Sequence, residues 1–589
     1  MISIIELRES VANAVAQAIN TLQLAGYKAD LVAILKTITI NDSYERGDIS
    51  SSIALQLYGK YALKVYKSPL DFAHAIVTAM PESEVYTSKV VNPGYINIDI
   101  ALAIKTDCVN EINTLKNNYG YLAKKNKKIL LEYVSANPTG PLHVGRARGA
   151  IVGMALARIL KVAGWDVDQE YYVNDNGRQL DVLALSVILS SKNIPLLQGC
   201  YTNLDLLQTT KNIEIASLVS RFTIDMLPNS SAAQDELIDS AITKCKAQCS
   251  RKEWRKLIDW IVENNLACIR NELATFDIQM DSYVYESALA TNQELGDYFH
   301  QLNNPMIYKD EEGTTWFKAT QYGEESDRVL IRASGVPTYF AYDLYYHILK
   351  LNRGYEGLIN IWGADHHGYV PRLTNALQAL TNSKIPLEIL LVQFVTLKNS
   401  LGVISSMSTR EGTAININQL VSSIGAGVVK IYYLQRSTSQ HIEFDLQSAL
   451  EQNNNNPYYY LQYAHARCVS LLHEAKVRYP NIATDYKLNP LDLLHVTSNC
   501  EIQLLQTLIR YPFVVHESAS TYSPHKPLIY LRDLATQFHL FYHEITILVD
   551  EEKIRTIRLT LIHAIKQVLH NGLSLYAIQT MDKLDRDEK

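Results

Sequence analysis

A histidine followed by small residues, in the stretch VSANPTGPLHVGRARGA, is the first place where residue types and spacing could do chemistry. Pro138 and Pro141 prevent a strand or helix from continuing through the segment before His143. Glycines then recur every four residues from Gly145 to Gly153, so one face of the following helix lacks side chains. An imidazole and free backbone amides at a helix N-terminus can meet the charge that develops on a phosphate. The pattern therefore predicts a nucleotide-binding loop.

Polar loops also follow two other expected strands. The apolar run Leu358–Trp362 is stopped by Gly363 and followed by ADHHG, and the run Leu390–Leu397 is followed by the polar loop 398–412, KNSLGVISSMSTREG. Ligands bind at the carboxyl ends of strands in open parallel sheets. A metal site is not expected, because the adjacent histidines of ADHHG diverge in direction and no third ligand is in view.

The elements that must position these loops begin with a βαβ unit. Ile129–Val134 is apolar enough for a short buried strand, the glycine-faced helix ends at Gly164, and Trp165–Val173 has the composition of the next strand. Asp327–Arg332 is expected to resume the same sheet after a mostly helical insertion at about 190–290. The predicted core is therefore a Rossmann-like α/β parallel sheet with a helical insertion.

Smaller domains are expected on both sides of this core. Apolar residues recur at helical spacing over Ile4–Leu22, and Pro93-Gly94 makes a turn before a strand. Beyond four consecutive asparagines near residue 455, the sequence is helical by period. We therefore expect a small α+β domain at 1–105, a linker at 106–128, the catalytic core at 129–450 and an all-α helical bundle at 451–589.

Length and composition are those of an ordinary multidomain globular protein. The 589 residues are too many for one hydrophobic core, and 47% are hydrophobic and 20% charged. The net charge of -6 excludes a wholesale cationic surface but allows a local RNA-binding patch. Basic residues around Trp254 allow an RNA contact or a charged helix face, of which the second is commoner. Seven scattered cysteines and the lack of an apolar run of about 18 residues predict a cytoplasmic location.

Four motifs in a fixed order carry a resemblance to a known family. VSANPTGPLHVGRARGA, WGADHHGYVPR, SMSTREGT and NPYYYLQYAHAR together resemble the class I arginyl-tRNA synthetases of bacterial type, over essentially the whole chain. The resemblance implies an arginine–tRNA ligase that forms arginyl-adenylate from arginine and ATP and transfers the arginyl group to the 3′-terminal ribose of tRNA(Arg). It further implies Mg²⁺ with ATP but no protein metal site, an activation step that requires tRNA, an N-terminal contact with the tRNA elbow, no membrane, and a monomer.

The same resemblance implies roles for individual residues. Those expected to bind ATP are Ser135, His143, Gly145, Gly363, Asp365, His366, Met407 and Ser408. Those expected to bind arginine are Glu132, Asn137, Tyr339 and Asp343. Carboxylates and amides suit a planar guanidinium with five donors, and the four-residue spacing of Tyr339 and Asp343 places both on one helical face. Those expected to contact tRNA are Tyr459, Arg467 and Tyr542, although most C-terminal aromatics must be core.

The sequence departs from the family at two catalytic positions. Arg146 stands where the first signature has its second histidine, and Thr409 stands where the second signature has a lysine that steadies the leaving pyrophosphate. Some family members without that lysine place one before the first signature, but this chain has Gly140 there. Arg410 is the best-placed substitute, ahead of Lys398. The alternative function is a synthetase-like paralogue that binds tRNA or arginine without efficient aminoacylation.

Overall fold

The structure, a computed structural model, divides the chain into two compact units. Its described residues are 3–24, 26–202, 212–224, 234–381, 385–398, 404–405, 416–481 and 486–584. Unit 1 combines Met1–Ala123 with Gln452–Lys589, and unit 2 is Lys124–Glu451. Among the described residues, no helix is both long and apolar enough to cross a membrane.

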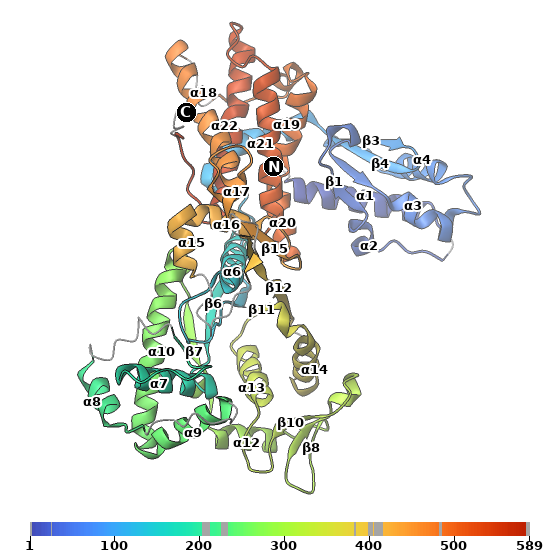
Figure 1. The fold of residues 1–589 in the computed structure, drawn as a ribbon. Coiled ribbons are helices and arrows are strands. Elements are labelled where there is room, and N and C mark those ends of the chain that lie inside the picture. Colours follow the sequence, from blue (N-terminus) through green and yellow to red (C-terminus); the bar gives the residue numbers. More distant parts are fainter. Residues whose placement is uncertain are drawn as a thin grey trace. The chain divides into compact units, whose positions relative to one another are not determined.

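Unit 2 is built on a five-stranded parallel sheet in the order β12-β11-β5-β6-β7 (Figure 1). The strands are β5 (Lys128–Glu132), β6 (Asp166–Val173), β7 (Ser282–Tyr285), β11 (Gly357–Gly363) and β12 (Leu387–Val392). The strands β6 and β7 lie on one side of β5, and β11 and β12 lie on the other side. The point between β5 and β11 is therefore where the strand order reverses and where such sheets bind ligands.

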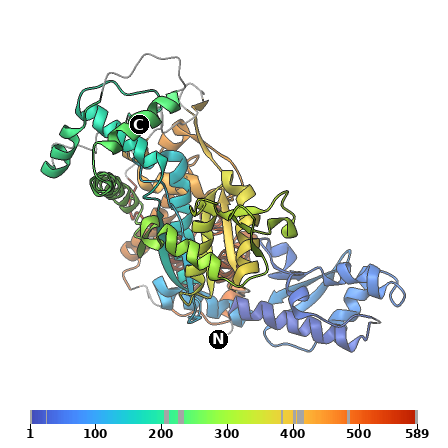
Figure 2. The same ribbon diagram turned by 90° about the horizontal axis from the view of Figure 1, so that it is seen from below.

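The helix α6 (Val144–Val162) connects β5 to β6 and lies against the sheet. A Cβ atom at Gly153 would lie only 2.1 Å from the ring of Tyr133, which follows β5, so this glycine permits the close approach. On the other side of the reversal, α13 (Tyr339–Leu351) precedes β11 and α14 (Val370–Thr381) follows it, as the proline near residue 370 predicts. Figure 2 shows the yellow segment that contains β11 and β12 from below.

The insertion is helical, and the sheet resumes earlier than expected. It contributes α7 (Arg178–Ser191), α8 (Ile213–Arg221), α9 (Gln234–Ala247) and α10 (Arg251–Ala274). The strand β7 lies within the range expected for the insertion, yet it pairs with β6. The sequence did not predict this strand, because its four residues, Ser, Tyr, Val and Tyr, carry little local signal of their partner.

Two expectations about strands are wrong. Asp327–Arg332 contains β10 (Arg328–Ile331), which pairs antiparallel with β9 (Thr315–Phe317) in a separate three-stranded sheet with β8 (Ile307–Lys309). An apolar run shows that a strand is buried but not which strand it joins. The run 390–397 is likewise two strands, because β13 (Val395–Lys398) leaves the parallel sheet and pairs with β15 (Ile442–Asp445) and β14 (Ile404–Ser405).

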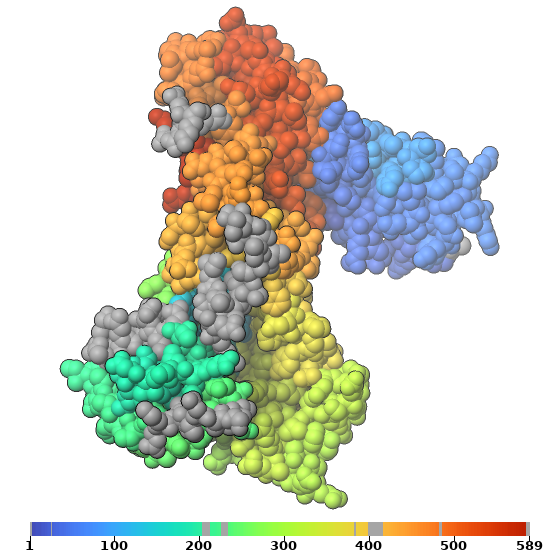
Figure 3. Space-filling view, in the orientation of Figure 1, coloured from blue at the N-terminus to red at the C-terminus, as the bar shows by residue number. Residues whose placement is uncertain are grey.

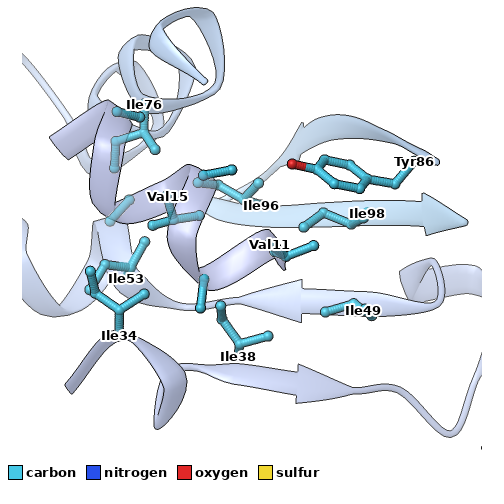
Figure 4. Close-up of a cluster of buried hydrophobic side chains, with 14 of the residues drawn as sticks. Val11, Val15, Ile34, Ile38, Ile49, Ile53, Ile76, Tyr86, Ile96 and Ile98 are labelled. Carbon is cyan, nitrogen blue, oxygen red and sulfur yellow. The ribbon is translucent and has the colours of Figure 1, made fainter. Parts of the chain in front are cut away.

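The N-terminal part of unit 1 is an α+β layer. Its sheet has the order β1-β2-β4-β3, formed by β1 (Ile38–Ile40), β2 (Ile49–Ser51), β3 (Tyr86–Val91) and β4 (Tyr95–Ile100). The helices α1 (Ile4–Thr21) and α4 (Pro69–Ala79) pack on it. Val11 and Val15 of α1, Ile76 of α4 and Ile98 of β4 are fully buried in this core (Figure 4).

The C-terminal part of unit 1 is a helical bundle. Its helices are α18 (Pro457–Arg478), α19 (Asn499–Ile509), α20 (Tyr511–Ser520), α21 (Lys526–Glu544) and α22 (Glu552–Ser574). The amide of Gln503 on α19 accepts from the backbone N–H of Tyr44 (3.0 Å) and donates to the carbonyl of Asp42 (2.7 Å). Gln506 donates to the carbonyl of Gly47 (2.8 Å). The blue N-terminal and red C-terminal surfaces of Figure 3 are therefore joined within one unit.

Candidate active site

His143 caps the N-terminus of α6. Its Nδ1 accepts from the backbone N–H of Gly145 (3.1 Å), so the remaining proton of the neutral ring is on Nε2. Burial and the neighbouring charge of Arg146 lower the pKa of His143 to about 4. A Cβ atom at residue 145 would lie 3.1 Å from the His143 ring, which explains why a glycine follows so closely. The site thus presents an uncharged N–H donor at the N-terminus of α6, the positive end of the helix dipole.

Two arginines on α6 have different environments. The Arg146 side chain is exposed in the first turn, beside His143. Arg148 is fully buried and donates to three backbone carbonyls, those of Gln393 (2.8 Å), Gln440 (2.7 Å) and Ser437 (2.8 Å). Burial lowers its pKa to about 10. Arg148 therefore fixes α6 to the connections that flank β13 and β15, a role that its place in the motif alone did not reveal.

Glu132, at the end of β5, is buried and already has a cationic partner. Its Oε2 is ion-paired with Lys350, and its Oε1 accepts from the Ser135 hydroxyl (2.9 Å). Lys350 is fully buried, lies 4.2 Å from the ring centroid of Tyr346 and donates to Asn360 (3.3 Å). The structure thus brings two predicted site residues together, but the hydroxyl of Ser135 is directed to a carboxylate.

The same network continues to Asp343 through a buried histidine. Asn360 donates to Nε2 of His347 (2.7 Å), whose Nδ1 donates to the carbonyl of Asp343 (2.7 Å). Burial and the nearby charge of Lys350 lower the pKa of His347 to about 3, so the ring is neutral. Asp343, His347 and Lys350 lie at positions i, i+4 and i+7 of α13 and share one face, a spacing from which this set could have been predicted.

Asp343 is the predicted arginine ligand with the most perturbed environment. Burial raises the pKa of its carboxyl to about 6; the charge of Glu132 acts in the same direction, and a hydrogen bond from Tyr369 acts in the opposite one. Its side chain is still 30% exposed, so solvent and a ligand can reach it. Such a carboxyl gains from a cation bound beside it, because that cation favours its charged form.

Asn137 and Tyr339 meet the start of the insertion. Asn137 donates to Gln179 (2.7 Å), and the Tyr339 hydroxyl lies 3.4 Å from the position of a Cβ atom at Gly177. Tyr339 itself is 69% exposed at the start of α13. The structure therefore places these two residues around one segment, 177–179, at the rim above the Glu132 network.

The predicted ribose site follows β11. Asp365 and His366 are 62% and 57% exposed, with 3.7 Å between Oδ2 of Asp365 and Nε2 of His366. A Cβ atom at Gly363 would lie 2.3 Å from Oδ1 of Asp365, so the carboxylate folds back over the glycine. An accessible acceptor thus lies at the carboxyl end of the strand next to β5.

The second signature falls outside the described residues. Met407, Ser408, Thr409 and Arg410 all lie there. The chain is described again at Asn416, which forms an antiparallel bridge with His143, and the backbone N–H of Ile417 donates to the carbonyl of Leu142 (3.2 Å). The residues after the second signature therefore meet the first one directly.

Three members of the basic cluster around Trp254 form ion pairs within the described part of the insertion. Lys246 bonds to Asp181 (2.8 Å), and Arg255 and Lys256 pair with Asp175 and Glu214. These contacts favour the interpretation as a charged helix face. A cavity of about 500 Å³ lies beside the cluster, away from His143, and is lined by Asp175, Asn176, Gly177, Leu180, Asp181, Lys246, Arg251, Trp254, Arg255 and Ile258.

In unit 1, two of the three residues expected to contact tRNA lie together. The guanidinium of Arg467 on α18 lies 3.8 Å from the ring centroid of Tyr542 on α21 and 5.3 Å from that of Tyr463. Tyr459 instead packs its ring edge-on to Tyr458, with 5.3 Å between centroids. Arg467 and Tyr542 thus form a partly exposed cation–π stack.

Known protein families match almost the entire sequence. The catalytic-domain model of the class I tRNA synthetases (R) matches residues 108–423, the arginyl tRNA synthetase N-terminal domain matches 6–100, and the DALR anticodon binding domain matches 461–584. The chain belongs to the class I arginyl-tRNA synthetases. This membership makes it an aminoacyl-tRNA synthetase that uses ATP, and it confirms the predicted family, fold class and ligase activity.

Individual relatives align with this chain over nearly its full length. The arginine–tRNA ligase of Coxiella burnetii is 35% identical over 602 residues, covering 99% of this chain and 100% of the relative. That of Thioalkalivibrio sulfidiphilus is 35% identical, covering 98% and 100%. Among solved structures, a putative arginyl-tRNA synthetase from Campylobacter jejuni has a TM-score of 0.62 at 30% identity, covering 82% of this chain and 100% of that one. The Thermus thermophilus arginyl-tRNA synthetase shares the fold, with a TM-score of 0.72 at 20% identity and coverage of 98% and 100%.

Proposed function

We propose that arginine is activated in the crevice at the carboxyl ends of β5 and β11, and that the arginyl group then passes to the terminal ribose of tRNA(Arg). The observation that carries this placement is the pair of carboxyl groups Glu132 and Asp343 at the strand-order reversal, on the sheet edge that also holds the His143 loop. A guanidinium needs acidic acceptors, and a nucleotide phosphate needs a helix N-terminus.

In the first step, a carboxylate oxygen of arginine attacks the α-phosphorus of ATP. A bond forms between them, the bond from that phosphorus to the bridging oxygen breaks, and pyrophosphate leaves with the electron pair. The Nε2–H of His143 and the positive end of the α6 dipole stabilise the charge that develops on the phosphate, and Arg146 adds positive charge from the same turn. Catalysis rests on position and electrostatics, without a covalent bond to the protein.

For arginine, Asp343 is the principal guanidinium partner. The charge of Glu132 is already balanced by Lys350, so Glu132 contributes its remaining acceptor positions and a negative field. Asn137 and Tyr339 close the rim of the pocket. Few competing amino acids offer five donors to this set, so no editing domain is required.

The remaining ATP contacts follow from the family motifs. Gly363, Asp365 and His366 hold the ribose, and Gly145 lets the base approach the backbone. Ser135, Met407 and Ser408 are assigned to ATP on the resemblance alone, as are Thr409 and Arg410 at the pyrophosphate. If ATP carries Mg²⁺, the ion would supply further positive charge at its phosphates. The described residues include no group of three His, Cys, Asp or Glu side chains suited to a metal, so no residue is assigned to it.

Transfer and partners complete the proposal. The ribose hydroxyl of tRNA attacks the adenylate carbonyl, an ester bond forms, and AMP leaves. Arg467 and Tyr542 contact the anticodon, with Tyr459 nearby on α18. We assign the chain to the cytoplasm, in keeping with its seven free cysteines. The monomer is assigned on the family resemblance alone.

The test is exchange of labelled pyrophosphate into ATP with arginine and tRNA(Arg), followed by charging of that tRNA. Exchange should require both arginine and tRNA. Binding of tRNA without exchange above background would overturn the proposal and identify the chain as a paralogue that has lost activity. Repeating the assay with Arg146→His and Thr409→Lys measures how much the two departures from the signatures slow activation.

A further inference from the structure

Glu272, near the end of the insertion helix α10, is hydrogen-bonded to the residue before His143 and to the segment that follows the second signature. Only 1% of it is exposed. Its Oε2 accepts from the backbone N–H of Leu142 (2.7 Å), the residue before His143. Its Oε1 accepts from the side-chain amide of Asn418 (3.3 Å), in the first turn of α15 (Ile417–Ile424). One carboxylate thus joins the insertion, the first signature and the segment after the second.

A second residue of α10 supports the beginning of the same loop. Asn265 is 2% exposed and donates to the carbonyl of Pro138 (2.9 Å). It lies seven residues before Glu272, which is two helical turns, so both side chains leave α10 on one face. Pro138 and Leu142 are therefore held at two points by the same rigid helix.

The carboxylate of Glu272 is costly to keep at this position. Among the described residues it forms no salt bridge, and burial raises its pKa to about 7 despite the bond from Leu142. Because its pKa is higher in the folded than in the unfolded chain, this carboxyl lowers stability progressively as the pH rises from its ordinary pKa to about 7, and the full loss is present above that pH. The thiol of Cys268, one turn away on α10, senses this charge, which adds to the effect of burial in raising the pKa of the thiol. A side chain that only filled space would avoid this penalty.

We propose that Glu272 is a positioning residue for ATP: by holding the Leu142 amide against α10 and α15, it sets the orientation of the His143 backbone and imidazole. The inference rests on the proposed role of His143. It extends that role to the insertion, which contains none of the family motifs, because a residue of the insertion would hold the ATP-binding residues in place for activation. Asp343, the principal guanidinium partner, lies on the other side of the strand-order reversal, so arginine binding should depend much less on this support than ATP binding does.

The matched variants are Glu272→Leu, Glu272→Gln and, as a control on the same helix, Glu263→Leu. Leucine leaves the Leu142 amide buried without an acceptor, whereas glutamine keeps one carbonyl oxygen for it. Glu263 is 52% exposed and bonds to Tyr285 and Arg270, away from the loop. Each protein is measured for its ATP dissociation constant by equilibrium dialysis and for the KM values of ATP and arginine in pyrophosphate exchange.

Glu272→Leu should weaken ATP binding about tenfold and leave the arginine KM within about twofold. Glu272→Gln and Glu263→Leu should stay within about threefold of the parent for both substrates. If Glu272→Leu fails to fold, Asn418→Ala carries the same test at the α15 end of the Glu272 contact, with an expected loss of about threefold for ATP.

Equal losses for ATP and arginine, or no loss in a folded variant, would overturn the positioning role. A parent that binds ATP without exchange contradicts the proposed function but still permits the comparison of ATP dissociation constants. A parent that does not bind ATP contradicts both.

Discussion

The two sides of the crevice are held by different kinds of interaction. On the ATP side, the Leu142 N–H donates to Glu272 and the Leu142 carbonyl accepts from Ile417, while the His143 ring accepts from the backbone N–H of Gly145. On the arginine side, a chain of buried charged and polar side chains runs from Glu132 to Asp343. We therefore expect a substitution on the ATP side to change the geometry of the site, whereas a substitution on the arginine side should change its charge and pH dependence.

The largest expected effect is on the buried ion pair. Lys350→Met leaves Glu132 buried without a cation, and we expect the free energy of unfolding to fall by about 3–5 kcal/mol. Urea denaturation measures it. The double variant Glu132→Gln/Lys350→Met removes both charges and should recover all but about 1 kcal/mol. A double variant as unstable as the single one would show that packing, not charge, holds this side.

Asp343→Asn should come next. It keeps the size of the side chain but removes the negative charge that we propose binds the guanidinium. The kcat/KM for arginine should therefore fall more than a hundredfold, which corresponds to a loss of about 3 kcal/mol of transition-state stabilisation. The KM for ATP should change little. Steady-state pyrophosphate exchange measures both, and a similar loss for both substrates would remove the distinction between the two sides.

Arg148→Lys tests geometry on the ATP side while keeping the charge. An ammonium cannot reproduce a planar fork that bridges three carbonyls, so unfolding should become easier by about 2 kcal/mol. The matched variant Arg146→Lys, exposed in the same helix, should change stability by less than about 0.5 kcal/mol. Thermal and urea unfolding compare them, and equal effects would contradict the role given to Arg148.

The smallest effect is on pH dependence. Arginine binds to the ionised form of Asp343, whose pKa is raised to about 6, so affinity is lost as the pH falls through that value. Between pH 7 and pH 5, kcat/KM for arginine should fall about tenfold more in the parent than in Asp343→Asn. A profile unchanged by the substitution would assign the titration to another group.

Local sequence signals predicted the elements of the site better than their partners. The apolar run 129–134 predicted β5, and the prolines before His143 and the glycines after it predicted the loop and α6, because these signals act within a few residues. The pairs that hold the crevice are remote in sequence: Glu132 and Lys350 are 218 residues apart, and Leu142 and Glu272 are 130 apart. No periodicity links such residues, just as none revealed that β10 pairs with β9. The roles of the individual site residues remain predictions.

The composition of unit 1 has a consequence for how the chain is made. Residues up to Ala123 share one unit with residues from Gln452 onward, so roughly 330 residues must be synthesised between the two parts. At about 5–20 residues per second, the N-terminal domain is synthesised roughly 20–80 s before α19 supplies Gln503 and Gln506. During that interval the N-terminal domain lacks Ile509, which completes its apolar cluster. Nascent chains should therefore be most exposed to proteases and chaperones before the last quarter of the message is translated.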